Sequence, residues 1–124
     1  MASPTERPTD EPRPAFGCTV LPFDGRAGSA SMRMAGALDA WTAADHARQL
    51  DVLLDEGYVE LRIELDELVL CTSDGLDLWD DVQHRLDPVG GHLTLAGATG
   101  VVRRVLDVMT ASPVHFCPTV LPAA

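Results

Sequence analysis

The sequence predicts an α/β domain with a mixed sheet of four to five strands and about three helices. Residues 58–65 (YVELRIEL) alternate apolar and polar side chains with a period of two, which is typical of a strand with one buried face. Residues 42–56 and 101–109 instead repeat apolar positions at helical spacing. Strand-like and helix-like segments alternate along the chain, and such alternation requires crossover connections and a largely parallel sheet.

The length limits the number of domains to one. The chain has 124 residues, and 46% of them are hydrophobic, which suffices for one compact core. Residues 1–14 are rich in proline and polar side chains, a composition that cannot bury surface, so we expect a flexible tail. Residues 15–124 then form the folded domain.

The first half of that domain predicts a hairpin followed by a helix. Two short apolar segments at 16–21 and 31–35 flank a turn at Asp24–Gly28, which indicates a β-hairpin. Thr42 has a carboxylate three residues later, an arrangement close to a capping box, so the first helix is expected over 42–56. Gly57 can close that helix.

The middle of the chain predicts a strand and a second helix. After the strand at 58–65, residues 68–71 extend the sheet region, and Thr72–Gly75 form a loop. The helix that follows ends at Pro88 and a glycine pair. Its apolar side consists of Leu76, Trp79, Val82 and Leu86.

The C-terminal third predicts a strand, a helix and a final strand. Residues 92–96 form the strand, and Thr99 can cap the helix. Residues 114–120 form the last strand, in which Pro118 indicates an edge position. The expected core stripe of the third helix is Val101, Val102, Val105, Leu106 and Met109.

The charge is acidic and concentrated. The formal net charge is −10, and residues 39–87 hold fourteen acidic residues against three arginines. Such a field repels phosphate backbones and anionic lipid headgroups, so neither nucleic acid nor a membrane surface is the expected partner. It favours a protein partner that offers Arg or Lys.

Composition also indicates the compartment. The three cysteines (Cys18, Cys71 and Cys117) are odd in number and form no CxxC pair, which favours a reducing compartment over a disulfide scaffold. No segment approaches the length of about 18 apolar residues that a membrane span needs, and the N-terminus does not resemble a signal peptide. All nine basic residues are arginine, a bias typical of GC-rich coding DNA. We therefore expect a cytoplasmic protein of bacterial origin.

Ser73 is the residue with the most informative surroundings. It lies on a short strand-to-helix loop before Gly75, where the first backbone N–H groups of the helix can stabilise an anion. A phosphate placed there would change the affinity for a partner. The alternative is that Ser73 or Asp74 only caps the second helix.

Several segments together resemble a known family. They are Gly36–Asp39, the strand at 58–65, Thr72–Leu76, Gly90–Gly97 and Val101–Met109. Their order and spacing resemble the STAS domain, the fold of bacterial anti-sigma factor antagonists, over about residues 16–120. The resemblance implies a STAS-like mixed sheet and no enzymatic activity. It also implies a protein partner, an anti-sigma factor serine kinase that phosphorylates the antagonist and thereby weakens their binding.

The resemblance is carried over position by position. Ser73 falls on the phosphoacceptor, Gly75 and Leu76 match the start of the second helix, and Gly36, Leu38 and Asp39 match the earlier turn. Two positions depart from the family pattern, because Thr72 stands in place of Asp and Asp74 in place of a second Ser or Thr. The partner surface then comprises Asp39, Thr72, Ser73, Asp74, Gly75 and Asp77. Because of these departures, a STAS scaffold or ligand-sensing module without phosphorylation is the alternative.

The remaining polar residues predict no metal, cofactor or catalytic site. Asp77, Asp80 and Asp81 with His84 lack an EF-hand loop, and we read them as a solvated or partner-facing surface. The four histidines (His46, His84, His92 and His115) and the cysteines show no zinc spacing. No GxSxG motif surrounds Ser73. Trp79 is expected in the core, and Trp41 beside Asp39 is a candidate partner anchor. The oligomeric state stays open.

Overall fold

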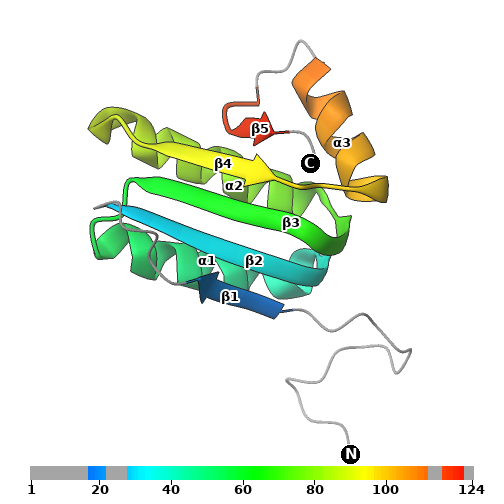
Figure 1. The fold of residues 1–124 in the computed structure, drawn as a ribbon, viewed down its shortest axis with the longest axis horizontal. Helices are drawn as coiled ribbons and strands as arrows, with labels where there is room; N and C mark the ends of the chain where they lie inside the picture. Colours follow the sequence, from blue (N-terminus) through cyan, green and yellow to red (C-terminus); the bar gives the residue numbers. More distant parts are fainter. Residues whose placement is uncertain (1–16, 22–27, 112–115, 122–124) are drawn as a thin grey trace, which may run out of the picture.

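A computed structural model describes residues 17–21, 28–111 and 116–121. The sheet contains five strands in the order β1-β2-β3-β4-β5, which are Gly17–Leu21, Ser29–Leu38, Glu60–Cys71, His92–Ala96 and Thr119–Leu121 (Figure 1). Strand β1 pairs antiparallel with β2, and the other neighbours pair parallel. The predicted hairpin and the predicted mixed sheet are confirmed. The expected tail at 1–14 and most of the expected turn at 24–28 lie outside the described residues.

Three α-helices accompany the sheet: α1 (Ala40–Asp55), α2 (Ser73–Leu86) and α3 (Gly100–Ala111). A short 3-10 helix, η1 (Asp87–Val89), follows α2 where the sequence predicts a stop at Pro88. Helices α1 and α2 lie side by side behind the sheet, whereas α3 lies beside β5 (Figure 1). The predicted number and order of helices are therefore correct.

The alternation of the strands decides which sheet face is buried. Met32, Ile63 and Leu95 are almost fully buried on three adjacent strands. Arg33 and Arg62, one position along, are exposed, because successive side chains point to opposite faces. One face thus packs on α1 and α2. The largest core side chains are Trp79, Met32, Met34, Leu38, Leu50, Leu61, Ile63, Leu65, Leu68, Leu86, Leu93 and Leu95.

Two expected boundaries near the first helix are wrong. Helix α1 begins at Ala40 instead of residue 42, because Asp39 and not Thr42 is its N-cap. The Asp39 Oδ1 accepts hydrogen bonds from the backbone N–H groups of Trp41 and Thr42, and the Thr42 Oγ1 accepts one from Asp39 N–H. The capping box is present, but it lies one helical turn earlier than expected. Residues 36–38, expected in a turn, complete strand β2.

The other differences concern strand lengths and the third helix. The expected strand at 58–65 begins two residues later, at Glu60, and joins the segment at 68–71 in one strand, β3. The pairing of β3 with β2 is irregular near its end. Strand β5 begins at Thr119; of the expected 114–120 strand, residues 116–118 are not extended into the sheet, and 114–115 lie outside the described residues. In α3, Val102 and Leu106 are buried, but Val101 is 52% exposed. Strand β5 is an edge strand, as Pro118 indicates.

Candidate functional site

Ser73 lies at the first position of α2, directly after the N-cap Thr72. Its side chain is exposed, as is that of Asp74. The backbone of Thr72 is extended, with φ −96° and ψ 176°, so the chain turns from strand β3 into the helix within one residue. The Ser73 side chain is therefore accessible to a second protein. It lies at the N-terminal end of α2, where the helix dipole favours negative charge.

Gly75 positions this first turn against the end of β2. A methyl group at Gly75 would lie 2.5 Å from Leu38 Cδ2 and 3.0 Å from Cys71 Sγ, both on buried side chains. Glycine has no Cβ, so it lets the first turn of α2 approach Leu38 and Cys71 this closely. The backbone N–H of Thr72 also donates to the Leu38 carbonyl at 2.9 Å. These contacts join the two motifs of the sequence resemblance, although they are 34 residues apart.

Asp39 follows Leu38 directly and is therefore part of the same sheet edge. Its carboxylate is half-buried and accepts hydrogen bonds at 2.9 Å from Trp41 N–H and 3.2 Å from Thr42 N–H. Asp39 thus fixes the start of α1. The structure brings it to the same edge as Thr72 through the contact between Thr72 and Leu38.

The acidic residues of α2 flank Ser73. The Thr72 hydroxyl donates to Asp74 Oδ2 at 3.2 Å. This hydrogen bond joins the two residues on either side of Ser73 and fixes the Asp74 carboxylate near the serine. Asp77 is exposed and follows Ser73 by four residues, which places both on one side of the helix. Asp39, Thr72, Ser73, Asp74, Gly75 and Asp77 therefore share one region, but Gly75 is buried and contributes packing.

Comparison with known proteins gives the fold. No protein-family model matches the chain, and no curated protein is similar to it in sequence. The anti-sigma factor antagonist SpoIIAA in its unphosphorylated form matches with a TM-score of 0.64 and 16% identity over 89% of this chain and 90% of that one. An anti-sigma factor antagonist from Mycobacterium paratuberculosis matches with a TM-score of 0.67 and 16% identity over 89% and 83% of the two chains. The chain has the STAS fold.

The phosphorylated form of the Bacillus cell fate determinant SpoIIAA has the same fold, with a TM-score of 0.63 and 16% identity over 89% of this chain and 92% of that one. The STAS fold expected from the sequence motifs is therefore confirmed, together with its mixed sheet. Within the described residues, no helix is long and apolar enough to cross a membrane.

Exposed apolar side chains occur at the same edge of the STAS fold as Ser73. Trp41, in the first turn of α1, is 48% exposed, and Val69 and Leu70, near the end of β3, are 55% and 41% exposed. Sequence reasoning singled out Trp41 but missed the other two. Their consecutive exposure follows from the irregular pairing of β2 with β3, which interrupts the alternation and leaves no signal in the sequence. Trp79, in contrast, is fully buried, as predicted.

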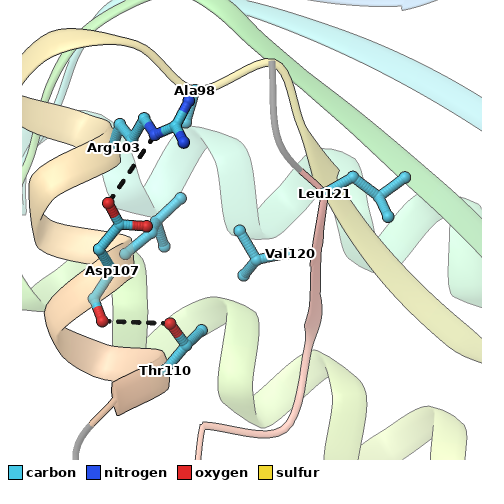
Figure 2. A pocket seen from close by; sticks show the side chains of 7 residues that line it. Ala98, Arg103, Asp107, Thr110, Val120 and Leu121 are labelled. Carbon is cyan, nitrogen blue, oxygen red and sulfur yellow. Dashed lines mark hydrogen bonds and ion pairs between the residues drawn. The ribbon is translucent and has the colours of Figure 1, made fainter. Parts of the chain in front are cut away.

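A cavity of about 220 Å³ lies between α3 and β5 (Figure 2). Its lining includes an ion pair between Arg103 Nε and Asp107 Oδ2 at 3.8 Å, and the Thr110 hydroxyl donates to the Asp107 carbonyl at 3.1 Å. None of the residues expected at the partner surface lines this cavity.

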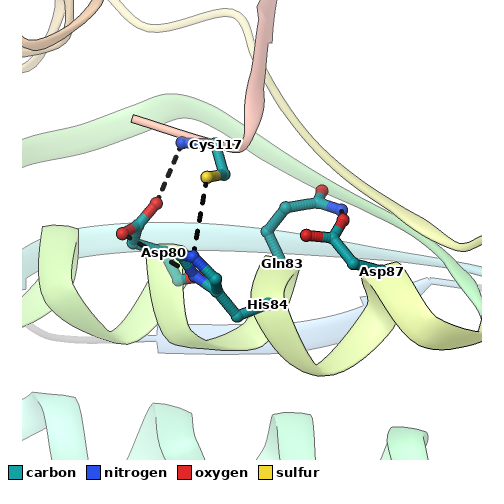
Figure 3. Close-up of polar contacts among 5 residues, drawn as sticks. All are labelled: Asp80, Gln83, His84, Asp87 and Cys117. Carbon is teal, nitrogen blue, oxygen red and sulfur yellow. Dashed lines mark hydrogen bonds and ion pairs between the residues drawn. The ribbon is translucent and has the colours of Figure 1, made fainter. Parts of the chain in front are cut away.

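A cluster of three polar side chains, from Asp80, His84 and Cys117, was not expected from the sequence. Asp80 and His84 of α2 meet Cys117, which lies two residues before β5 (Figure 3). Sequence analysis considered Asp80 with His84, and the histidines with the cysteines, but predicted no metal site from either set. It did not join all three residues, because 33 residues separate His84 from Cys117. Only the pairing of β5 with β4 brings them together.

Proposed function

We propose that the protein is an anti-sigma factor antagonist-like regulator that binds an anti-sigma factor serine kinase. The partner surface consists of Asp39, Thr72, Ser73, Asp74, Gly75 and Asp77, and phosphorylation of Ser73 is the switch. The observation that supports this proposal best is the exposed Ser73 at the start of α2, in a fold shared with SpoIIAA, which has been solved both without and with phosphate.

The charge and the volume of a phosphate on Ser73 explain how phosphorylation changes the affinity for the partner. A phosphate on Ser73 adds about −1.5 to −2 charges at pH 7 and three strong acceptor oxygens. The N-terminus of α2 tolerates that charge, but Asp74 and Asp77 are close and repel it. The added charge alone favours a basic partner. Binding therefore weakens because the phosphate adds volume at the exposed Ser73 side chain and keeps the two surfaces from docking closely.

Affinity capture from a bacterial extract tests the proposal. The baits are the wild-type chain, Ser73→Ala and Ser73→Glu, and mass spectrometry identifies the captured proteins and any phosphate on Ser73. We expect a serine kinase with wild type and with Ser73→Ala, and its loss with Ser73→Glu. Thr110→Glu is the matched control, because it adds the same charge on an exposed residue of α3, outside the partner surface.

Two outcomes of the affinity capture would contradict the proposal. If wild type and Ser73→Glu capture the same proteins and Ser73 is never modified, the phosphorylation switch is wrong. If Thr110→Glu loses the kinase as fully as Ser73→Glu does, net charge and not the Ser73 position decides the binding.

A second candidate function is a scaffold or ligand-sensing module without phosphorylation. The hydrogen bond from the Thr72 hydroxyl to Asp74 Oδ2 favours it, because a carboxylate is held where a phosphate on Ser73 would need space. In that case Ser73→Ala has no effect in the cell, and a small ligand or a larger complex co-purifies. Asp74→Asn discriminates further: it increases the rate of Ser73 phosphorylation if the site is a kinase substrate, and changes nothing if it is not.

A further inference from the structure

Three side chains with different ligand atoms converge outside the partner surface. Asp80, His84 and Cys117 each offer one ligand atom, and these atoms lie within 4.8 Å of one another (Figure 3). The Cys117 Sγ lies 3.8 Å from His84 Nε2. Tetrahedral zinc, with a Zn–S distance of about 2.3 Å and a Zn–N distance of about 2.0 Å, separates two such ligand atoms by about 3.5 Å. A small side-chain adjustment therefore converts this arrangement into a ligand set.

The histidine already has the orientation of a metal ligand. Its Nδ1 lies 2.8 Å from the Asp80 carbonyl oxygen, so Nδ1 carries the proton and donates to that carbonyl. The lone pair of Nε2 then points toward Cys117. Metal-bound histidines typically donate their other ring N–H to a carbonyl or a carboxylate in this way, which fixes the tautomer and the ring orientation.

Asp80 holds the cysteine in place. Its Oδ1 accepts a hydrogen bond from the backbone N–H of Cys117 at 2.9 Å. This bond is compatible with metal binding, because the carboxylate has a second oxygen and each oxygen has two lone pairs. Asp80 and His84 are on one side of α2, since they are four residues apart.

The surrounding charge also favours a cation. The hydrogen bond to the Asp80 carbonyl raises the pKa of His84, and the nearby Asp80, Asp87 and Asp81 carboxylates raise it further. Burial raises the pKa of the Cys117 thiol, and the charge of Asp80 adds to that effect. The Asp80 carboxylate thus places negative charge beside both His84 and Cys117. A divalent ion reduces this repulsion and favours the thiolate.

We propose that Asp80, His84 and Cys117 form a binding site for a divalent transition-metal ion of the zinc class, with water as the fourth ligand. A thiolate and an imidazole select such ions over Mg²⁺ and Ca²⁺, which prefer oxygen ligands. The His84 side chain is 59% exposed, so the ion and the water reach the site from solvent. Binding releases the thiol proton of Cys117 to solvent and joins the segment before β5 to α2. This site does not depend on the proposed partner.

Titration of the reduced, full-length chain with CoCl₂ and with ZnCl₂ tests the site. Co²⁺ is a spectroscopic probe that shows a charge-transfer band in the near ultraviolet when a thiolate binds it. We expect this band at one ion per chain, its displacement by Zn²⁺, and release of a proton on binding. Cys117→Ser abolishes the band. His84→Gln removes a direct ligand and weakens Zn²⁺ binding by at least about 10- to 100-fold, the loss that is typical for removing a hydrogen-bond partner of a ligand.

Glu67→Gln and His92→Gln are the matched controls, since they change an exposed carboxylate and an exposed imidazole outside the cluster. They leave the band and the affinity unchanged. Circular dichroism checks that each variant folds, and the wild-type unfolding temperature rises with Zn²⁺ whereas that of Cys117→Ser does not. A band that persists in Cys117→Ser, or equal losses in the controls, overturns the proposal. So does an affinity for Zn²⁺ no greater than that for Mg²⁺.

Discussion

A buried histidine connects the two helices behind the sheet. The Trp79 Nε1–H donates to His46 Nε2 at 2.9 Å, and both side chains are fully buried. An acceptor Nε2 requires a neutral imidazole. Burial lowers the pKa of His46 to about 4. Helices α1 and α2 are thus held by a bond that exists only while the ring is unprotonated.

This residue makes stability depend on pH. Between pH 6.5 and pH 4 the unfolded state binds a proton at His46 and the folded state does not, so the free energy of unfolding falls as the pH falls. The expected loss is about 3 kcal/mol, complete below pH 4 and absent above pH 6.5. Urea unfolding across this range measures it. His46→Gln keeps an acceptor for Trp79 but does not titrate, and parallel curves for the two proteins would rule out His46 as the cause.

Helix α2 contributes residues to three parts of the molecule: the core, the proposed partner surface and the cluster with Cys117. Its buried side packs on the sheet through Leu76, Trp79, Val82 and Leu86, its N-terminus presents Ser73, and Asp80 and His84 face the segment before β5. Gln83 joins the helix to the sheet, because its Nε2 donates to the Gly91 carbonyl at 3.2 Å and its Oε1 accepts from Leu93 N–H at 2.8 Å. A polar residue therefore lies at a buried position of an otherwise apolar side.

Gln83→Leu tests this junction between α2 and β4. The substitution leaves the Gly91 carbonyl and the Leu93 N–H without their side-chain partner in a buried place, so unfolding becomes easier by about 2–4 kcal/mol although leucine is more apolar. Chemical denaturation measures the difference. Asp81→Ala, on the exposed side of the same helix, changes the free energy by less than about 0.5 kcal/mol. Unchanged stability of Gln83→Leu would show that the two hydrogen bonds contribute nothing.

Three acidic residues lie at the edge of the sheet where strands β2 and β3 end. Strands β2 and β3 are parallel neighbours, so their carboxyl ends and the first turns of α1 and α2 lie together. In open α/β sheets this is the edge where ligands bind. Asp39, Asp74 and Asp77 belong to it, and the exposed Trp41 donates its backbone N–H to the Asp39 carboxylate at 2.9 Å. Acidic residues near an exposed aromatic side chain suit the basic partner surface that we propose.

For the kinase partner that we propose, the association rate is expected to depend on salt. Raising NaCl from about 50 to about 500 mM screens the acidic surface, and we expect the rate to fall at least about tenfold. Stopped-flow mixing measures this rate. Asp77→Asn lowers it about two- to threefold at low salt, whereas Asp107→Asn, the same charge change on α3, alters it less. Equal effects of both variants would place the binding surface elsewhere.

Local patterns by themselves determined the elements of this chain. Alternation at 58–65 and helical spacing after residues 42, 75 and 99 follow from which side chains face the core, and that signal is local. The boundary of α1 was missed by two residues because two capping boxes overlap in sequence, and the hydrogen bonds of Asp39 select between them. The order of motifs predicted the STAS fold, and with it the region of Ser73.

Tertiary structure alone decided the contacts between distant segments. The approach of Gly75 to Leu38, the bond between Trp79 and His46, and the meeting of His84 with Cys117 each join residues more than 30 positions apart. No periodicity reports such pairs, because they depend on which strands are neighbours and on the register between them. Val69 and Leu70 are exposed for the same reason, since an irregular pairing with β2 and not their apolar character decides their position.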